Sequence, residues 1–191
     1  MTRALGHDFY ARDPAEVARA LLGKTLVRKL DSDRLEGFIV ETEAYYGEGD
    51  PASRAFKGRK IYNEVMWGEP GHLFVYNVHR YWMLNLVAHE PGGVGGVLIR
   101  ALEPTRGVEA MLANRPVEKL TELTGGPGKL SVALAVEKSL NGLKATDEKS
   151  PIHVLQGESE PEVTSSYRIG VTRDLPERLR FYVKGNKFVS R

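Results

Sequence analysis

Helical and strand-like patterns of apolar residues alternate along the chain, and residues that favour turns separate them. The first helical pattern follows Asp13, which can cap a helix, and Pro14, which suits a first turn. Val17, Ala20 and Leu21 then share one face at helical spacing. We therefore expect an amphipathic helix here, with its apolar face against the core.

Strand-like patterns outnumber helical ones and occur in pairs. Residues 25–30 and 35–42 flank the turn-forming residues 31–34 and predict a hairpin. Residues 72–78 and 81–87 predict a second hairpin with a tight turn. Further strands are expected at 97–102, 152–155, 167–171 and 179–183, further helices at 108–113 and 129–140, and a loop over 47–70.

This order of elements predicts a single compact α+β domain over residues 1–191. We expect a curved, mostly antiparallel sheet flanked by helices, with the hairpin at 72–87 protruding. The length fits one domain, and 41% apolar with 27% charged residues is ordinary for a globular protein.

Composition removes several classes of protein. The chain has no cysteine, which excludes a disulfide framework, a thiolate metal site and a cysteine nucleophile. The first residues lack an apolar signal segment, and no apolar run approaches the ~20 residues that span a bilayer. We expect a cytoplasmic protein without a membrane partner, nucleoid-associated if prokaryotic. A net charge of +2 permits nucleic-acid binding without requiring it.

Two carboxylates at the end of a predicted strand form the first candidate site. Glu41 and Glu43 are two residues apart, so on a strand they point to the same face. Close carboxylates can push their pKa values apart, which suits acid–base chemistry. The alternative is a solvated strand end with two exposed glutamates.

The second candidate site is the segment 71–82, which is rich in aromatic residues. Rings at a surface suit stacking on nucleic-acid bases, whereas a core strand pair would use them as filler. His79 and Arg80 fall on the expected turn, which favours exposure there. His72, His79 and His89 lack the spacing of metal ligands, so we expect no metal site.

A charged residue inside an apolar strand is the third candidate. Arg100 lies within residues 97–102, and Glu103 with Pro104 is expected to end that strand. A partly buried arginine needs an anionic partner. That partner is either a structural glutamate of the core, or an active-site carboxylate or phosphate.

A glycine-rich approach to a helix is the fourth candidate. Residues 125–128 offer free backbone N–H groups, and Lys129 could join them in holding a phosphate. Leu130 follows the lysine, so this is not a Walker loop. A plain turn at the start of a helix is the alternative.

Taken in order, these motifs resemble the alkyladenine DNA glycosylase family, the mammalian type of 3-methyladenine DNA glycosylase. The resemblance covers nearly the whole chain. The Glu-Thr-Glu-Ala-Tyr segment (41–45) and the Arg-Ala-Leu-Glu-Pro segment (100–104) are together highly specific. The other matching segments are residues 5–10, 21–24, 71–76, Asn85, 126–130, 168–171 and 179–183.

The resemblance implies a catalytic set and a mechanism. Glu43 is the general base that activates water, and Arg100 with the carbonyl of Ile169 helps to hold that water. The carboxylate must be ionised, and we expect Arg100 to keep its pKa low. The ionised carboxylate of Glu43 would also stabilise the positive charge that develops on the sugar. Neither a metal nor an organic cofactor is needed.

The resemblance also implies a pocket for an extruded base. Tyr45 and Tyr76 form its walls, Asn85 screens the base edge against ordinary guanine, and Lys129 contacts a phosphate. Extruding a base costs a few kcal/mol, of which aromatic stacking recovers a part.

The chain departs from the family pattern at the third wall of this pocket. Family members usually carry histidine there, after a segment like residues 50–53, whereas this chain has Arg54. A guanidinium can stack on a base but is permanently charged. We expect Arg54 to disfavour cationic bases such as 3-methyladenine relative to neutral ones such as hypoxanthine or ethenoadenine.

The hairpin tip is a second departure. Family members usually place a tyrosine there as a wedge into the minor groove, whereas the alignment puts His79 there and the hairpin is one residue shorter. His79 or Tyr81 is the expected wedge, with Arg80 beside them as a further DNA contact.

Three functions fit these residues. The first is a monomeric, monofunctional glycosylase that acts on damaged purines in double-stranded DNA. The second is a catalytically silent DNA-binding relative, and the third a hydrolase of free nucleosides. Because both departures fall on DNA and base contacts while Glu43 and Arg100 remain, altered specificity is favoured over lost chemistry. The hairpin and Lys129 favour long DNA over free nucleosides.

Overall fold

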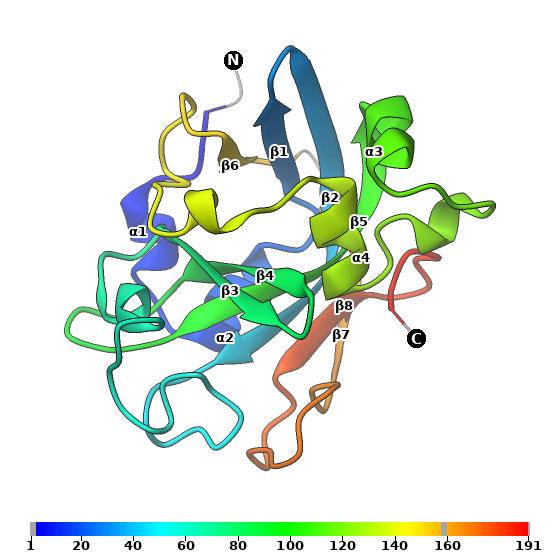
Figure 1. Ribbon diagram of the computed structural model, residues 1–191. Helices are drawn as coiled ribbons and strands as arrows, with labels where there is room; N and C mark the ends of the chain where they lie inside the picture. The colour runs from blue at the N-terminus through cyan, green and yellow to red at the C-terminus, as the bar shows by residue number, and fades with distance from the viewer. Residues whose placement is uncertain (1–2, 158–159, 191) are drawn as a thin grey trace.

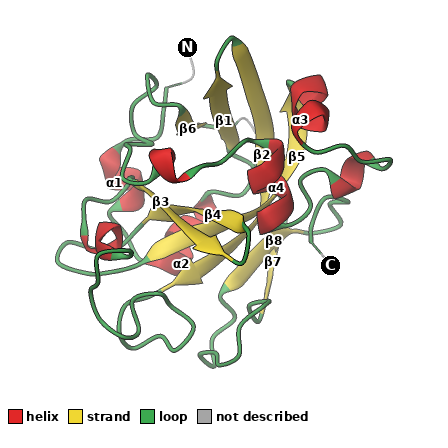
Figure 2. Cartoon of the chain, viewed as in Figure 1, coloured by secondary structure: helices red, strands yellow, loops and turns green. Residues whose placement is uncertain are grey.

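A curled antiparallel sheet forms the centre of the molecule, and short helices pack around it (Figures 1 and 2). The computed structural model describes residues 3–157 and 160–190. The sheet has eight strands in the order β3-β4-β5-β2-β1-β6, and β8 pairs with both β2 and β7. The predicted α+β fold with a curved, mostly antiparallel sheet is confirmed.

The strands are β1 (Thr25–Leu30), β2 (Asp33–Tyr45), β3 (Leu73–Val78), β4 (Tyr81–Val87), β5 (Gly96–Arg106), β6 (Ile152–Leu155), β7 (Val163–Ser166) and β8 (Arg180–Val183). The α-helices are α1 (His7–Tyr10), α2 (Pro14–Ala20), α3 (Val108–Asn114) and α4 (Pro127–Ala133). Within the described residues there are also three 3₁₀ turns: η1 (Glu64–Trp67), η2 (Leu120–Glu122) and η3 (Lys138–Leu140). No helix among these described residues is long and apolar enough to cross a bilayer.

The strand β2 organises the sheet and is its longest strand. One edge pairs with β5, while the other pairs first with β1 and then, at Glu41–Glu43, with β8. The register with β5 shifts on both sides of Glu41, which marks an irregularity that bends the strand. From Ile39 to Ala44 every residue is buried, so this half of β2 is covered on both faces.

The helix α2 covers one of those faces, as its sequence predicted. Asp13 caps it by accepting the N–H of Ala15 at 2.8 Å. Val17 and Leu21 are fully buried in the core. Thr42 ties β2 to the helix by donating its hydroxyl to the Ala18 carbonyl at 2.8 Å.

The strand predicted at 97–102 is longer than expected. It continues as β5 to Arg106, so Glu103 and Pro104 do not end it. The pairing of β5 with β4 covers only Gly96–Leu98, and Pro104 lies well beyond it. Proline lacks an N–H to donate, so it is tolerated in the part of β5 that has no pairing with β4.

The helix predicted at 129–140 is shorter and starts earlier. It occupies Pro127–Ala133, and the chain then turns at Ala135, whose φ is +47°. The buried side chain of Arg28 donates to the carbonyls of Leu134 (3.1 Å) and Ala135 (3.3 Å). Arg28 therefore caps the end of this helix, a long-range contact with no local sequence signal.

The strand predicted at 167–171 is wrong. The strand β7 lies just before it, at Val163–Ser166, and residues 167–171 form a loop. Side-chain carboxylates take the backbone N–H groups there: Arg168 donates to Asp174 at 3.3 Å and Ile169 to Glu43 at 2.7 Å. These bonds replace the strand pairing that the apolar pattern suggested.

Candidate active site

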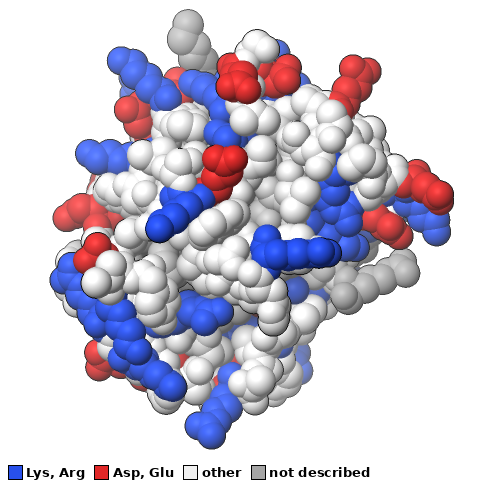
Figure 3. All heavy atoms as spheres, viewed as in Figure 1, with Lys and Arg blue, Asp and Glu red and all other residues white. Residues whose placement is uncertain are grey.

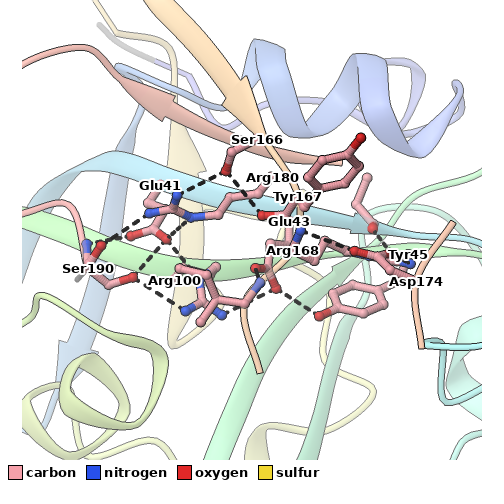
Figure 4. A network of polar contacts seen from close by, with 12 residues as sticks. Glu41, Glu43, Tyr45, Arg100, Ser166, Tyr167, Arg168, Asp174, Arg180 and Ser190 are labelled. Atoms are coloured by element: carbon pink, nitrogen blue, oxygen red, sulfur yellow. Dashed lines mark hydrogen bonds and ion pairs between the residues drawn. The ribbon is translucent and has the colours of Figure 1, made fainter. Parts of the chain in front are cut away.

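The second half of β2 places Glu41, Glu43 and Tyr45 on one face of the sheet, beside Arg100 of β5 and Arg180 of β8 (Figure 4). Both glutamates are 0% exposed. The alternative of a solvated strand end with exposed glutamates is therefore wrong. We call Glu41, Glu43, Arg100 and Arg180 the inner cluster.

Glu43 accepts three hydrogen bonds from three different segments. Its Oε1 accepts the backbone N–H of Ile169 at 2.7 Å. Its Oε2 accepts the Tyr45 hydroxyl at 2.7 Å and Nη1 of Arg100 at 3.2 Å. The carboxylate is thus fixed in direction, which a general base requires.

Burial raises the pKa of Glu43, and this effect outweighs the opposing influence of Arg100, the Ile169 N–H and the Tyr45 hydroxyl. The expectation that Arg100 would keep this pKa low is wrong in its net direction, because the carboxyl is fully desolvated. A raised pKa makes the ionised carboxylate a stronger base.

The pKa of Glu41 shifts in the opposite direction to that of Glu43. Burial alone would raise its pKa, but Arg100, Arg180 and the backbone N–H of Ser190 together lower it below the ordinary value. Its Oε1 accepts from Nε of Arg100 at 2.9 Å and from Nε of Arg180 at 2.7 Å. The pKa values of the two carboxyls move apart, as their shared face predicted, mainly because their surroundings differ.

Arg100 joins the two carboxylates and is 6% exposed. Its ion pair with Glu41 matches the structural interpretation of a buried arginine, and its contact with Glu43 matches the functional one. The structural alternative is therefore confirmed, and a catalytic role for the contact with Glu43 stays a prediction.

Ile169 meets this cluster through its backbone. The structure shows its N–H bonded to Glu43, and the residue as a whole is 37% exposed. The expected role of its carbonyl in holding water stays a prediction.

A second buried ion pair lies behind Tyr45 and was not foreseen as part of the site. Arg168 bonds both oxygens of Asp50 at 2.7 Å and reaches Asp174 at 2.6 Å. Its guanidinium lies 4.6 Å from the centre of the Tyr45 ring. We call Arg168, Asp50 and Asp174 the Arg168 clamp, because it ties the loops after β2 and β7 together around Tyr45.

Arg54 lies against Tyr76, one of the two tyrosines predicted to form walls of a base pocket. Its guanidinium is 4.7 Å from the centre of the Tyr76 ring, and Phe74 stacks on Tyr76 with centroids 5.0 Å apart. Burial raises the pKa of Tyr76, and Arg54 opposes that shift. Tyr76 in turn contributes to the raised pKa of Tyr45, so the two predicted walls are electrostatic neighbours.

Asn85 is turned toward the backbone. It is 5% exposed, and its amide nitrogen donates to the carbonyls of Phe74 at 3.0 Å and Met83 at 3.2 Å. Those bonds occupy its donors and leave the amide oxygen as the group that could meet a base. The screening role stays a prediction.

The tip of the β3–β4 hairpin separates the two wedge candidates. His79 is exposed at the turn with a φ of +54°, whereas the Tyr81 ring lies against α4, where a Cβ on Gly128 would approach its Cγ to 3.1 Å. Arg80 covers the Tyr81 ring and donates to its hydroxyl at 3.1 Å. His79 is therefore the freer of the two side chains.

A groove of about 630 Å³ runs between the hairpin tip and α4 and reaches Arg100. We call it the outer groove, and beside Arg100 its lining includes His79 and the cations Arg115, Lys119, Lys129 and Lys187, with Glu122 as its one carboxylate among the described residues. In the part of the chain that the structure describes, no ion pair engages Arg115 or these three lysines. Blue side chains lie beside α4 on the face shown in Figure 3.

The described residues contain no group of three or more His, Asp or Glu side chains placed to hold a metal ion. Arg168, Asp50, Asp174, Arg180 and Phe74 belong to the site but not to the residues selected from the sequence. Arg180 offered the same signal as Arg100, an arginine inside an apolar strand. Arg168 directly precedes Ile169 in a matching motif.

Comparisons with known proteins agree with the motif pattern. Residues 8–187 match the family model described as methylpurine-DNA glycosylase (MPG). A protein of Mesorhizobium japonicum is 45% identical over 93% of this chain and 86% of its own length. A protein of Methanocella arvoryzae is 44% identical over 98% and 96%, and one of Aeropyrum pernix is 40% identical over 100% and 95%. All three carry the name "Putative 3-methyladenine DNA glycosylase".

Proposed function

The chain belongs to the methylpurine-DNA glycosylase family, and on that premise we propose that it is a base-excision-repair enzyme. It hydrolyses the N-glycosidic bond of alkylated or deaminated purines in double-stranded DNA. The observation that carries the proposal is Glu43, a buried carboxylate fixed by Arg100, Tyr45 and Ile169.

The proposed reaction uses water as the nucleophile. Glu43 takes a proton from water, the water oxygen bonds to C1′ of the sugar, and the bond from C1′ to the purine nitrogen breaks. The electron pair leaves with the base, and a lesion that is neutral also takes up a proton. The ionised Glu43 stabilises the positive charge on the sugar meanwhile. An intact abasic site is the product, so the enzyme is monofunctional and needs no cofactor.

Access to the bond requires base flipping. The purine rotates out of the duplex and stacks between Tyr45 and Tyr76, while His79 fills the gap that it leaves. The cations of the outer groove, which have no ion pair among the described residues, support DNA as the substrate, because phosphates would neutralise them. The protein acts as a monomer on one duplex.

Neutral lesions are the preferred class. Arg54 lies over Tyr76 in the predicted base pocket, and its fixed charge repels a cationic base such as 3-methyladenine. Replacing it, Arg54→His, lowers the preference for hypoxanthine over 3-methyladenine several-fold, since up to about 1 kcal/mol of charge repulsion is removed. Single-turnover excision of both lesions by both proteins measures this ratio. An unchanged ratio contradicts the assignment.

One assay separates the three candidate functions. Duplex oligonucleotides bearing hypoxanthine, ethenoadenine or 3-methyladenine are incubated with the protein and then cleaved with alkali. The proposal predicts strand breaks with the wild type and none with Glu43→Gln. Binding without breaks indicates a silent DNA-binding relative, and release of base from free inosine alone indicates a nucleoside hydrolase.

A further inference from the structure

One residue outside the family motifs touches the inner cluster on the side away from Tyr45 (Figure 4). Ser190 donates its backbone N–H to Oε2 of Glu41 at 2.6 Å and its hydroxyl to Oε1 of Glu41 at 2.8 Å (Figure 4). The same hydroxyl accepts Nη2 of Arg100 at 3.3 Å. Its carbonyl accepts Nη2 of Arg180 at 3.1 Å. A single serine thus bonds to three buried or nearly buried charges.

These bonds complete the inner cluster. Two carboxylates face two guanidinium groups there, so the charges balance. Arg100 directs a separate donor to each neighbour: Nε to Glu41, Nη1 to Glu43 and Nη2 to Ser190. A planar guanidinium held at two of these points has its third direction fixed.

The contact of Arg100 with Glu43, which concerns the reaction, is the longer of its two bonds to carboxylates. Nη1 lies 3.2 Å from Glu43, whereas Nε lies 2.9 Å from Glu41. If Nη2 loses the Ser190 hydroxyl, Arg100 gains freedom to swing about its bond to Glu41. A buried donor would also be left unsatisfied, which favours such a movement.

The segment that carries Ser190 is itself anchored. Asn186 donates its amide to Glu103 of β5 at 2.6 Å and accepts the N–H of Phe188 at 2.9 Å. The carbonyl of Phe188 lies close to Gly125, where a Cβ would meet it at 3.0 Å. The segment therefore presents Ser190 to the cluster from a fixed turn rather than from a loose end.

We propose that Ser190 is a positioning residue that holds Glu41 and Arg100 in place and so aims Arg100 at Glu43. It does not touch substrate, and it acts only through these two side chains. This inference rests on the proposed function of Glu43 as the base. It assigns a role in that reaction to a serine outside every matching motif.

The experiment compares Ser190→Ala, which removes the hydroxyl, with Ser190→Thr, which keeps it. Thr42→Val is the matched control. Thr42 also has a buried hydroxyl on β2, but its hydroxyl bonds to the Ala18 carbonyl under α2. Single-turnover excision of hypoxanthine from duplex DNA is followed from pH 5 to 9, with DNA affinity and melting temperature measured alongside.

The proposal predicts that Ser190→Ala lowers the excision rate about tenfold, the scale of losing the two part-buried hydrogen bonds of its hydroxyl. DNA affinity stays constant, and the acid limb of the pH profile moves to higher pH because Arg100 holds the charge of Glu43 less firmly. Glu41, Arg100 and Tyr45 are the charged or titratable groups that act on Glu43 there. Ser190→Thr retains the wild-type profile, and Thr42→Val loses stability without moving the limb.

A wild-type pH profile in Ser190→Ala overturns the proposal, as does an equal shift in Thr42→Val. Titration of ¹³C-labelled glutamate carboxyls adds a readout that needs no activity. A higher pKa of Glu43 in Ser190→Ala supports the positioning role even if the wild type excises nothing, an outcome that would reject the proposed function alone. An unchanged titration rejects the positioning role.

Discussion

The inner cluster and the outer groove lie side by side, since Arg100 belongs to one and reaches the other. In the inner cluster each arginine faces a carboxylate, and little solvent reaches either. In the outer groove Arg115, Lys119, Lys129 and Lys187 surround a single carboxylate without an ion pair among the described residues.

This difference separates two tasks. Charges that are buried and paired hold a fixed geometry, because leaving one of them uncompensated costs several kcal/mol. Exposed cations without partners keep their attraction for an external polyanion. We therefore expect changes in the buried clusters to alter stability or rate, and changes in the outer groove to alter affinity and salt dependence.

The largest expected effect is on stability and comes from the Arg168 clamp. Arg168→Met leaves Asp50 buried without its bidentate partner, which we expect to cost about 3–5 kcal/mol. Urea unfolding measures the loss. The matched control is Arg19→Met, because Arg19 also stacks on a ring, that of Phe181, but is exposed. A loss below about 1 kcal/mol in Arg168→Met would show that the clamp is not structural.

A smaller effect is expected in the outer groove. Lys129→Ala and Lys187→Ala together should weaken DNA binding about tenfold and reduce the salt slope of log K by roughly two, with the single-turnover rate at saturation unchanged. Lys184→Ala is the control, because that lysine already pairs with Glu162. Fluorescence anisotropy across salt concentrations makes the comparison. Equal slopes for both proteins would mean that the groove does not bind phosphates.

The smallest expected effect is a displacement along the pH axis. Burial raises the pKa of Glu43 in the folded protein above its ordinary value of 4.5, and the proposed reaction needs the ionised form. Activity is therefore full above that raised pKa and falls as the pH drops through it. The acid limb of the pH–rate profile should lie above pH 4.5, measured while circular dichroism reports an intact fold. A limb at or below 4.5 contradicts a desolvated Glu43 as the base.

Much of the fold follows from local sequence patterns. Short apolar segments predicted β1 and β6 with their observed bounds, and the capping residue Asp13 marked the start of α2. Two of the errors occur where distant side chains bond to backbone groups. Arg28 ends α4 early, and Glu43 takes the N–H of Ile169 that a strand would have used. Such contacts join residues more than a hundred positions apart and leave no periodic signal.

Site residues that lie in recognisable motifs could be predicted from the sequence, and residues outside those motifs could not. The family resemblance inferred from them is confirmed, and Glu43, Arg100 and Tyr45 do lie together. The net pKa shift of Glu43 was misjudged, since sequence shows which charges are near but not how far burial removes water. Ser190 and Asp174 were missed because a lone serine or aspartate in a loop looks like any other surface residue.

The central claim is that Glu43 performs the chemistry while the rest of the site holds the substrate. The most direct test measures binding and single-turnover excision of a hypoxanthine duplex by the wild type and Glu43→Gln in parallel. The account predicts nearly equal affinities and a rate about 10³-fold lower for the variant, the scale expected for a lost general base. Equal excision rates would contradict it.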